Sequence, residues 1–126
     1  MSEPIVFISH FRIREGKLDS LKQQIQKVTE QIKANKPGTV VFLQYLNEAG
    51  TELSIIHVFP DAESFDRHSE GVQERAKAAF ETIALTRREV YGMPSDQALA
   101  MTRPPDGSGV SFRLMSQLAD GYIRFI

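Results

Sequence analysis

The chain has 126 residues, the size of one domain, and can bury a hydrophobic core without disulfide or metal support. Its 15 basic and 16 acidic residues nearly balance and form no basic stripe, so we expect no nucleic-acid partner. Cysteine is absent, which excludes disulfides, thiolate nucleophiles and cysteine-based metal centres. Neither a signal peptide nor an apolar run of about 18 residues is visible, so we expect a cytoplasmic protein without a membrane span.

The first two predicted elements are a strand and a helix. β-branched and aromatic residues crowd residues 5–13, and the first half of this segment is apolar on both faces, which predicts a strand covered from two sides. From residue 17 to 35, leucine, isoleucine and valine recur every three or four positions, which predicts a helix that ends before Pro37-Gly38. The same stripe fits coiled-coil spacing but is shorter than roughly three heptads, so we favour a helix that packs on its own core.

A hairpin and a second helical region follow. Residues 39–46 and 52–59 are predicted strands, and Gly50 can take the positive φ that their loop needs. Asp61 is in the position of an N-cap for helical residues that run to about 85. Gly71 interrupts this region, so it is either two helices or one kinked helix.

The last predicted elements are a fourth strand over residues 87–91 and a C-terminal extension. Ser95 caps a short helix to about Met101, and a loop rich in Pro and Gly then leads to short extended pieces at 110–114 and 122–126. The resulting order β-α-β-β-α-β predicts an α+β, ferredoxin-like fold, whose antiparallel sheet carries both helices on one face. We expect residues 1–92 to form this domain. Residues 93–126 are expected to pack as an extension on the same domain or on a partner subunit.

The strands are apolar on both sides, whereas a sheet with one bare face should alternate apolar and polar residues. We therefore expect two sheets to pack face to face in a homodimer, a dimeric α/β barrel with the helices outside. In that case the C-terminal tail wraps the partner or closes a barrel end. Alternatively, the tail covers the sheet of its own subunit with its apolar residues Val110, Phe112, Leu114, Tyr122, Phe125 and Ile126.

Four segments resemble the antibiotic-biosynthesis-monooxygenase-like domains of the dimeric α+β barrel superfamily. They are Phe11 to Lys17 before the first helix, Pro37-Gly38-Thr39 before the second strand, Val58 to Phe65 after the hairpin, and Glu89 to Gly92. The resemblance covers residues 4–92 and lies in turns, caps and core positions. It implies the dimeric barrel. It also implies an activity among those of the superfamily, which includes cofactor-independent monooxygenases of polycyclic phenols and quinols, quinol monooxygenases and haem-degrading enzymes.

We expect no cofactor and no metal ion. The haem-degrading relatives use an Asn on the first strand, a Trp and a helical His. Here His68 could be the ligand, but Ser9 occupies the Asn position and Trp is absent. A metal site made of His10, His57 and His68 has no HxH or HExxH spacing to support it. Walker, Rossmann and GxSxG patterns are also absent, which argues against nucleotide cofactors bound through known motifs.

The histidines are the candidate catalytic groups, because a histidine of near-neutral pKa can take a proton from a phenol. We prefer His57 as the base, since its apolar neighbours in the central third strand should depress its pKa by desolvation. The alternative for His57 is a hydrogen-bonded place in the dimer interface. His10 is the second candidate, and one register puts it on the same face as His57, whereas a slip of one residue separates the two. The candidate substrate-binding residues are Ser9, Tyr45, Tyr91 and His68.

These expectations favour a small homodimeric protein that binds a small aromatic or hydrophobic molecule between sheet and helices. Monooxygenase activity on phenol- or quinol-type substrates is one hypothesis. The alternative is a non-catalytic ligand-binding or stress-response protein on the same fold. A base and a hydroxyl lining a closed apolar pocket would favour the enzyme, and a pocket filled by Phe and Leu side chains would favour the alternative.

Overall fold

A computed structural model describes residues 3–124, so Phe125 and Ile126 of the predicted tail lie outside the described residues. The elements in chain order are β1 (Ile5–Ile13), α1 (Leu18–Asn35), β2 (Val41–Leu46), β3 (Glu52–Phe59), α2 (Ala62–Ser69), α3 (Val72–Ala79), β4 (Ile83–Tyr91), α4 (Asp96–Thr102) and β5 (Ser111–Met115). This order confirms the predicted α+β, ferredoxin-like fold.

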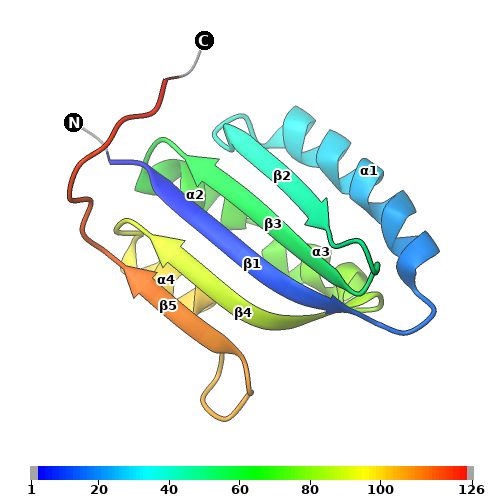
Figure 1. Ribbon diagram of the computed structural model, residues 1–126. Coiled ribbons are helices and arrows are strands. Elements are labelled where there is room, and N and C mark those ends of the chain that lie inside the picture. Colours follow the sequence, from blue (N-terminus) through cyan, green and yellow to red (C-terminus); the bar gives the residue numbers. More distant parts are fainter. Residues whose placement is uncertain (1–2, 125–126) are drawn as a thin grey trace.

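The strands form one sheet in the order β2-β3-β1-β4-β5. The pairs β2–β3, β3–β1 and β1–β4 are antiparallel, and β5 joins the edge parallel to β4. Figure 1 shows the helices on one side of the sheet and no element in front of the other side, the open face. Within this chain the sheet therefore does not close into a barrel. As predicted, the third strand lies between the first and the second.

Two predicted boundaries and one alternative for the tail are wrong. The helical region ends at Ala79 instead of residue 85, and β4 begins at Ile83 instead of residue 87. The reason is that residues 83–85 pair with β1 and bury their apolar side chains in the core, which outweighs their helical spacing. Up to residue 124 the tail does not cover the open face of its own subunit, since β5 extends the sheet edge and Tyr122 is exposed.

Two hydrophobic clusters lie between the sheet and the helices, and they contain residues from different ends of β1. The first contains Phe7, Phe59 and Phe65, and the second contains Phe11 and Leu21. In β1 the residue between Phe7 and Phe11 that also faces the helices is Ser9, which belongs to neither cluster. The middle of the sheet is therefore the part that no cluster fills.

Both predicted N-caps are confirmed, and one of them connects the extension to the domain. Asp61 accepts a hydrogen bond from the Ser64 amide at 2.7 Å, and Ser95 accepts one from the Ala98 amide at 3.1 Å. The Ser95 hydroxyl also donates to Asp66 of α2 at 2.7 Å, so the cap of α4 is tied to the neighbouring helix. This places α4 beside α2 on the helical side of the sheet.

The open face has an apolar part and a polar part. The register aligns Val41, Val58 and Val6 in one row and Leu43, Ile56 and Ile8 in the next, and we call these six residues the apolar patch. The following row is polar and runs across all five strands as Tyr45, Ser54, His10, Arg87 and Ser111. Next to the patch, β4 adds Glu89 and Tyr91 on the same face, because side chains alternate along a strand.

Candidate functional site

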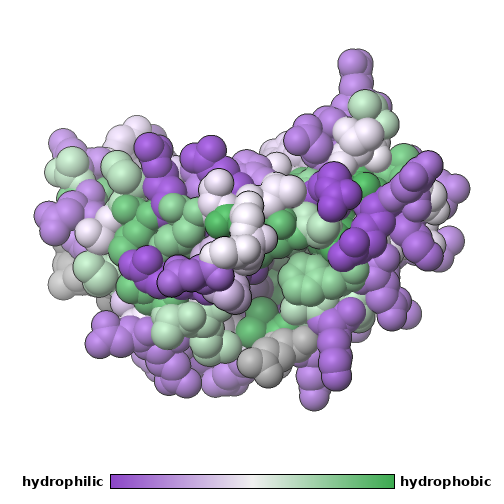
Figure 2. Space-filling view, turned by 90° about the horizontal axis from the view of Figure 1, so that it is seen from below, coloured by the Kyte–Doolittle hydropathy of each residue, from purple (hydrophilic) through white to green (hydrophobic). Residues whose placement is uncertain are grey.

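A cavity of about 610 Å³ lies between the sheet and the helices. Its walls are largely aromatic and aliphatic, with Phe7, Phe11 and Phe42 from the sheet and Val28 and Ile32 from α1. Figure 2, which views the molecule from below in Figure 1, shows groups of apolar side chains on either side of paler and hydrophilic residues, with mostly hydrophilic residues at the rims. A concave, mostly apolar space of this size is typical of a small-molecule site.

Two buried histidines lie side by side in the cavity wall. His57 of β3 is 6% exposed and stacks on Phe7, with its ring centroid 4.7 Å from that of His68 in α2. His57 Nδ1 lies 3.3 Å from the Phe7 carbonyl oxygen, and His68 Nδ1 lies 2.7 Å from the Thr39 hydroxyl. These contacts fix both rings, and they bring together two of the predicted site residues.

Burial makes both histidines weak bases. The pKa of His57 is lowered from 6.5 to about 4, chiefly by desolvation and to a smaller extent by the charges of Arg75 and Arg88. The pKa of His68 is lowered to about 2, again first by desolvation and then by His57 and Arg75. Both rings are therefore neutral near pH 7. The depression of the His57 pKa that its apolar neighbours predicted is present.

Two arginines bring positive charge into this apolar space. Arg88 of β4 lies 5.5 Å from the Phe7 ring centroid and donates to the Thr102 carbonyl oxygen at 3.1 Å. Its Nε is buried and has no hydrogen-bond partner among the described residues. Arg75 of α3 also lines the cavity and donates to the His68 carbonyl oxygen at 2.6 Å. Burial lowers the pKa of both guanidinium groups.

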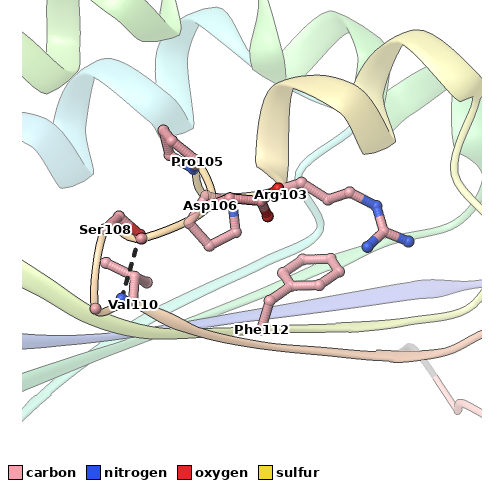
Figure 3. A pocket seen from close by; sticks show the side chains of 9 residues that line it. Arg103, Pro105, Asp106, Ser108, Val110 and Phe112 are labelled. Carbon is pink, nitrogen blue, oxygen red and sulfur yellow. Dashed lines mark hydrogen bonds between the residues drawn. The ribbon is translucent and has the colours of Figure 1, made fainter.

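The C-terminal extension forms part of the cavity wall. Arg103, Pro104, Pro105 and Val110 line the cavity from the loop between α4 and β5. Figure 3 shows this loop from a smaller pocket on its other side, with the Arg103 guanidinium above Phe112. That guanidinium carbon lies 5.0 Å from the ring centroid, and the Ser108 hydroxyl accepts from the Val110 amide at 3.2 Å. The loop thereby limits the access of solvent to this side of the cavity.

Three of the predicted site residues, His10, Tyr45 and Tyr91, lie on the opposite face of the sheet. His57 pairs with Phe7, and His10 pairs with Ser54, so the register that put His10 and His57 on one face is wrong. The alternative, a register shifted by one residue, is correct. Such a shift moves each side chain of one strand to the other face relative to its partner strand, and it separates His10 from His57. Tyr45 and Tyr91 share the open face with His10, whereas Ser9 and His68 line the cavity with His57.

His10 is part of a hydrogen-bonded network across three strands of the open face. Its Nδ1 lies 2.9 Å from the Ser54 hydroxyl, and its Nε2 lies 2.7 Å from the Glu89 carboxylate. The Tyr91 hydroxyl donates to the second Glu89 oxygen at 2.6 Å, and the Arg87 Nε lies 3.7 Å from the first. The pKa of Glu89 is lowered, first by the hydrogen bond from Tyr91.

Sequence reasoning missed Arg75, Arg88, Ser54 and Glu89. Arg87 and Arg88 are neighbours in a strand, so strand alternation places one of them on each face of the sheet. Ser54 and Glu89 are polar residues inside apolar strands, and that position is the signal by which they could have been found. Among residues 3–124, no group of three or more His, Cys, Asp or Glu side chains could hold a metal ion. No helix in this part of the chain is long and apolar enough to cross a membrane.

Comparison with known proteins finds similarity in structure. No family model matches the chain, and no curated protein matches its sequence. MupZ from Pseudomonas fluorescens matches with a TM-score of 0.71 and 20% identity over 96% of each chain. SnoaB from Streptomyces nogalater, a cofactor-independent oxygenase, matches with a TM-score of 0.61 and 15% identity over 75% of this chain and 96% of SnoaB. A candidate antibiotic biosynthesis monooxygenase from Caulobacter crescentus matches with a TM-score of 0.60 and 13% identity, over 71% of this chain and 86% of its own.

The coverage differs in a way that concerns the extension. Because the match to MupZ covers 96% of the chain, it includes most of the residues after β4, whereas the other two matches cover about three quarters of the chain or less. At these identities the likeness concerns the fold. The chain has the ferredoxin-like α+β fold of antibiotic-biosynthesis-monooxygenase-like proteins.

Proposed function

We propose that the chain belongs to the antibiotic-biosynthesis-monooxygenase-like family and binds a small aromatic or hydrophobic molecule in the cavity, with a ligand oxygen at Arg88. One observation carries this proposal. The Arg88 Nε is buried in the wall of a mostly apolar cavity and has no hydrogen-bond partner among the described residues. Apolar walls around a few converging polar groups are the usual composition of a small-molecule site.

The charge of Arg88 supports a ligand whose oxygen is negative or shares a proton. The ion pairs among residues 3–124 involve other side chains, and no carboxylate lies within 4.0 Å of the Arg88 or Arg75 guanidinium. A buried charge without a counter-charge costs several kcal/mol. A phenolate, enolate or carboxylate would supply both the missing acceptor and the opposite charge.

The activity we favour is cofactor-independent oxygenation of a phenol- or quinol-type substrate, the class of activity for which SnoaB is named. Because the Phe7 carbonyl can only accept, His57 Nδ1 carries the proton and Nε2 keeps a lone pair for the substrate proton. With a pKa of about 4, His57 is a weak base. Arg88 and Arg75 must therefore drive much of the deprotonation by stabilising the substrate anion.

The anion then reacts with dioxygen without a metal or flavin. One oxygen atom becomes the carbonyl oxygen of the oxidised ring carbon. The other oxygen atom leaves as water, which takes the hydrogen of that carbon and the proton that His57 removed from the substrate. The cavity contributes by excluding bulk water from the anion, which strengthens its interaction with the two guanidinium groups.

A non-catalytic ligand-binding or stress-response protein is the second candidate, and the low basicity of His57 favours it. A histidine that is neutral from about pH 4 upward can serve as a hydrogen-bond partner without taking part in proton transfer. The same apolar walls and the same Arg88 would then hold a ligand that the protein does not change. The two functions share the site and differ only in turnover.

The homodimer belongs to this proposal as well. The six side chains of the apolar patch form a contiguous surface on the open face, and Leu43 is 44% exposed. A second copy with the same patch would cover it, because a two-fold interface uses the same surface on both subunits. The division into a domain of residues 1–92 and an extension of 93–126 follows from the same arrangement. The extension adds the loop beside the cavity and the edge strand β5.

Calorimetric titration and oxygen uptake with a panel of hydroquinones, anthrones and naphthoic acids test the proposal. Arg88→Met keeps an unbranched side chain and removes the charge at the cavity. Arg87→Met, one position earlier, removes a charge from the opposite face and is the matched control. We expect Arg88→Met to weaken binding of an anionic ligand by about 10-fold to 100-fold, the loss of a hydrogen bond to a charged group. Arg87→Met should leave the affinity unchanged.

The outcomes separate the two candidate functions. Uptake by the wild type that is lost in folded His57→Gln supports the oxygenase. Binding without uptake by any compound supports the ligand-binding protein. The site itself is refuted if no compound of the panel binds, or if Arg87→Met and Arg88→Met weaken binding equally.

A further inference from the structure

A second chemical group lies on the open face of the sheet, apart from the cavity. Ser54, His10 and Glu89 come from β3, β1 and β4, which lie next to one another in Figure 1. The Ser54 Oγ is 2.9 Å from His10 Nδ1, and His10 Nε2 is 2.7 Å from Glu89 Oε1. We propose that these residues form a hydrolytic centre that cleaves esters or thioesters of apolar acyl groups. This activity does not depend on the ligand proposed for the cavity.

The hydrogen bonds define which nitrogen of His10 is the base. The ionised Glu89 carboxylate can only accept, so the hydrogen of the neutral His10 ring is on Nε2. Nδ1 then carries the lone pair and accepts the hydrogen bond from the Ser54 hydroxyl. A nucleophile bonded to a base, and a base oriented by an acid, is the arrangement that activates serine for covalent catalysis.

Glu89 is held as a carboxylate by groups other than His10. Its side chain is 12% exposed and accepts the Tyr91 hydroxyl on Oε2 at 2.6 Å. The Arg87 Nε lies 3.7 Å from Oε1 and adds a positive charge. A partly buried negative charge beside His10 stabilises the imidazolium that forms when Nδ1 takes the serine proton. Glu89 is therefore a positioning residue in this proposal.

The surroundings of Ser54 indicate the substrate. A pocket of about 340 Å³ opens beside it and is lined by His10, Tyr45 and Leu46. Phe11 and Leu53 also line this pocket, so an apolar acyl group would lie on hydrophobic side chains outside the apolar patch. Tyr45 is directly opposite Ser54 in β2, and its hydroxyl is the donor we assign to the negative oxygen of the intermediate.

The reaction has two acyl-transfer steps and needs water as its co-reactant. Ser54 Oγ forms a bond to the acyl carbon while its proton moves to His10 Nδ1. The bond to the alcohol or thiol then breaks, and the leaving group departs with the proton from Nδ1. In the second step water gives its proton to Nδ1, its oxygen bonds to the acyl carbon, and the Ser54 oxygen leaves with that proton. The products are the free acid and the alcohol or thiol.

The position of the network is compatible with dimerisation through the apolar patch. The polar row is at one end of the patch, and the His10 side chain is 36% exposed within the chain. Purely structural hydrogen bonds would need the same geometry but no reactive serine. The two roles therefore differ in the reactivity of Ser54, and that property is the one to measure.

Hydrolysis of p-nitrophenyl butyrate and of a butyryl thioester by the purified full chain tests the proposal and separates the two leaving groups. We expect Ser54→Ala and His10→Gln each to lower kcat/KM by at least about 100-fold, and Glu89→Gln to lower kcat with little change in KM. Ser111→Ala, at an exposed residue of the same polar row on the edge strand, is the matched control and should keep full activity.

A covalent readout does not depend on choosing the right substrate. A fluorophosphonate probe should add its mass to the peptide that contains Ser54, and His10→Gln should reduce the labelling as strongly as the hydrolysis. If Ser54→Ala does not fold, Ser54→Cys provides the test, since a cysteine there should be alkylated faster than in Ser54→Cys/His10→Gln. Hydrolysis that survives in folded Ser54→Ala, or absence of both hydrolysis and labelling in the wild type, would overturn the proposal.

Discussion

The two buried histidines should make the protein sensitive to mild acid. Both have a pKa of about 6.5 when unfolded, whereas the folded values are about 4 for His57 and about 2 for His68. Because these folded values lie below the unfolded one, the unfolded state binds more protons as the pH falls below about 6.5. The contribution of both histidines to the free energy of unfolding is therefore fully present above that pH. As the pH falls, the contribution of His57 decreases down to about pH 4, and that of His68 decreases further, to about pH 2.

The magnitude follows from the width of this window. At pH 5 each histidine is about 1.5 units below its unfolded pKa and still neutral in the fold, and one unit corresponds to about 1.4 kcal/mol. Each should therefore lower the free energy of unfolding by about 2 kcal/mol between pH 7.5 and pH 5, or about 4 kcal/mol together. Domains of this size are stable by about 5–15 kcal/mol in total.

Urea unfolding followed by circular dichroism at pH 7.5 and pH 5, at one fixed protein concentration, measures this loss. His57→Phe should reduce the pH-dependent loss to about half, since aromatic neighbours such as Phe7 and Phe42 can accept a ring there. Thr102→Val, at another buried polar residue, should change stability equally at both pH values. A wild-type loss below about 1 kcal/mol, or an unchanged loss in His57→Phe, would refute the reasoning.

Three further predictions concern stability and assembly. Ser95→Ala removes the N-cap of α4 and its bond to Asp66, and should lower the free energy of unfolding by about 1 kcal/mol in the same urea assay. Gly92→Ala should lower the free energy of unfolding more, because Gly92 has φ +109° and a Cβ there would lie 2.7 Å from the Pro4 carbonyl oxygen. Gly107 also has a positive φ, +79°, but no atom within 4 Å of such a Cβ, so Gly107→Ala isolates the effect of the clash. Light scattering should give twice the 14.2 kDa of the chain, and Ile56→Lys in the apolar patch should shift it to the monomer mass; a wild-type mass of one chain would contradict the homodimer.

The fold was predictable because local and global signals agree in most of the chain. The limits of β1 and β3 follow from runs of β-branched and aromatic residues, and both N-caps follow from single side chains with one local role. The prediction failed at residues 83–85, where an apolar segment fits a helix and a strand equally well. Pairing with β1 decided in favour of the strand, and this long-range contact has no local signature.

The candidate site was only half predictable, because a strand register is a relation between two segments. The pairing of His57 with Phe7 decides which histidine enters the cavity, and no local feature of either strand specifies that pair. Burial of the more apolar faces of β1 and β3 under the helices selects the register. His10 is excluded from that face by its hydrogen bonds to Ser54 and Glu89.

Arg88 faces the cavity because β4 contains a β-bulge, which the simple alternation of side chains along a strand does not predict. Leu85 and Arg88 both face the helices although they are three residues apart, because the register shifts where Thr86 lies beside His10. The Thr86 hydroxyl donates to the His10 carbonyl oxygen at 3.0 Å and stabilises this bulge. Without the extra residue, the side chains after it would change faces, and Arg88 would lie on the open face. The bulge therefore gives the cavity its buried positive charge and places Glu89, one residue later, beside His10.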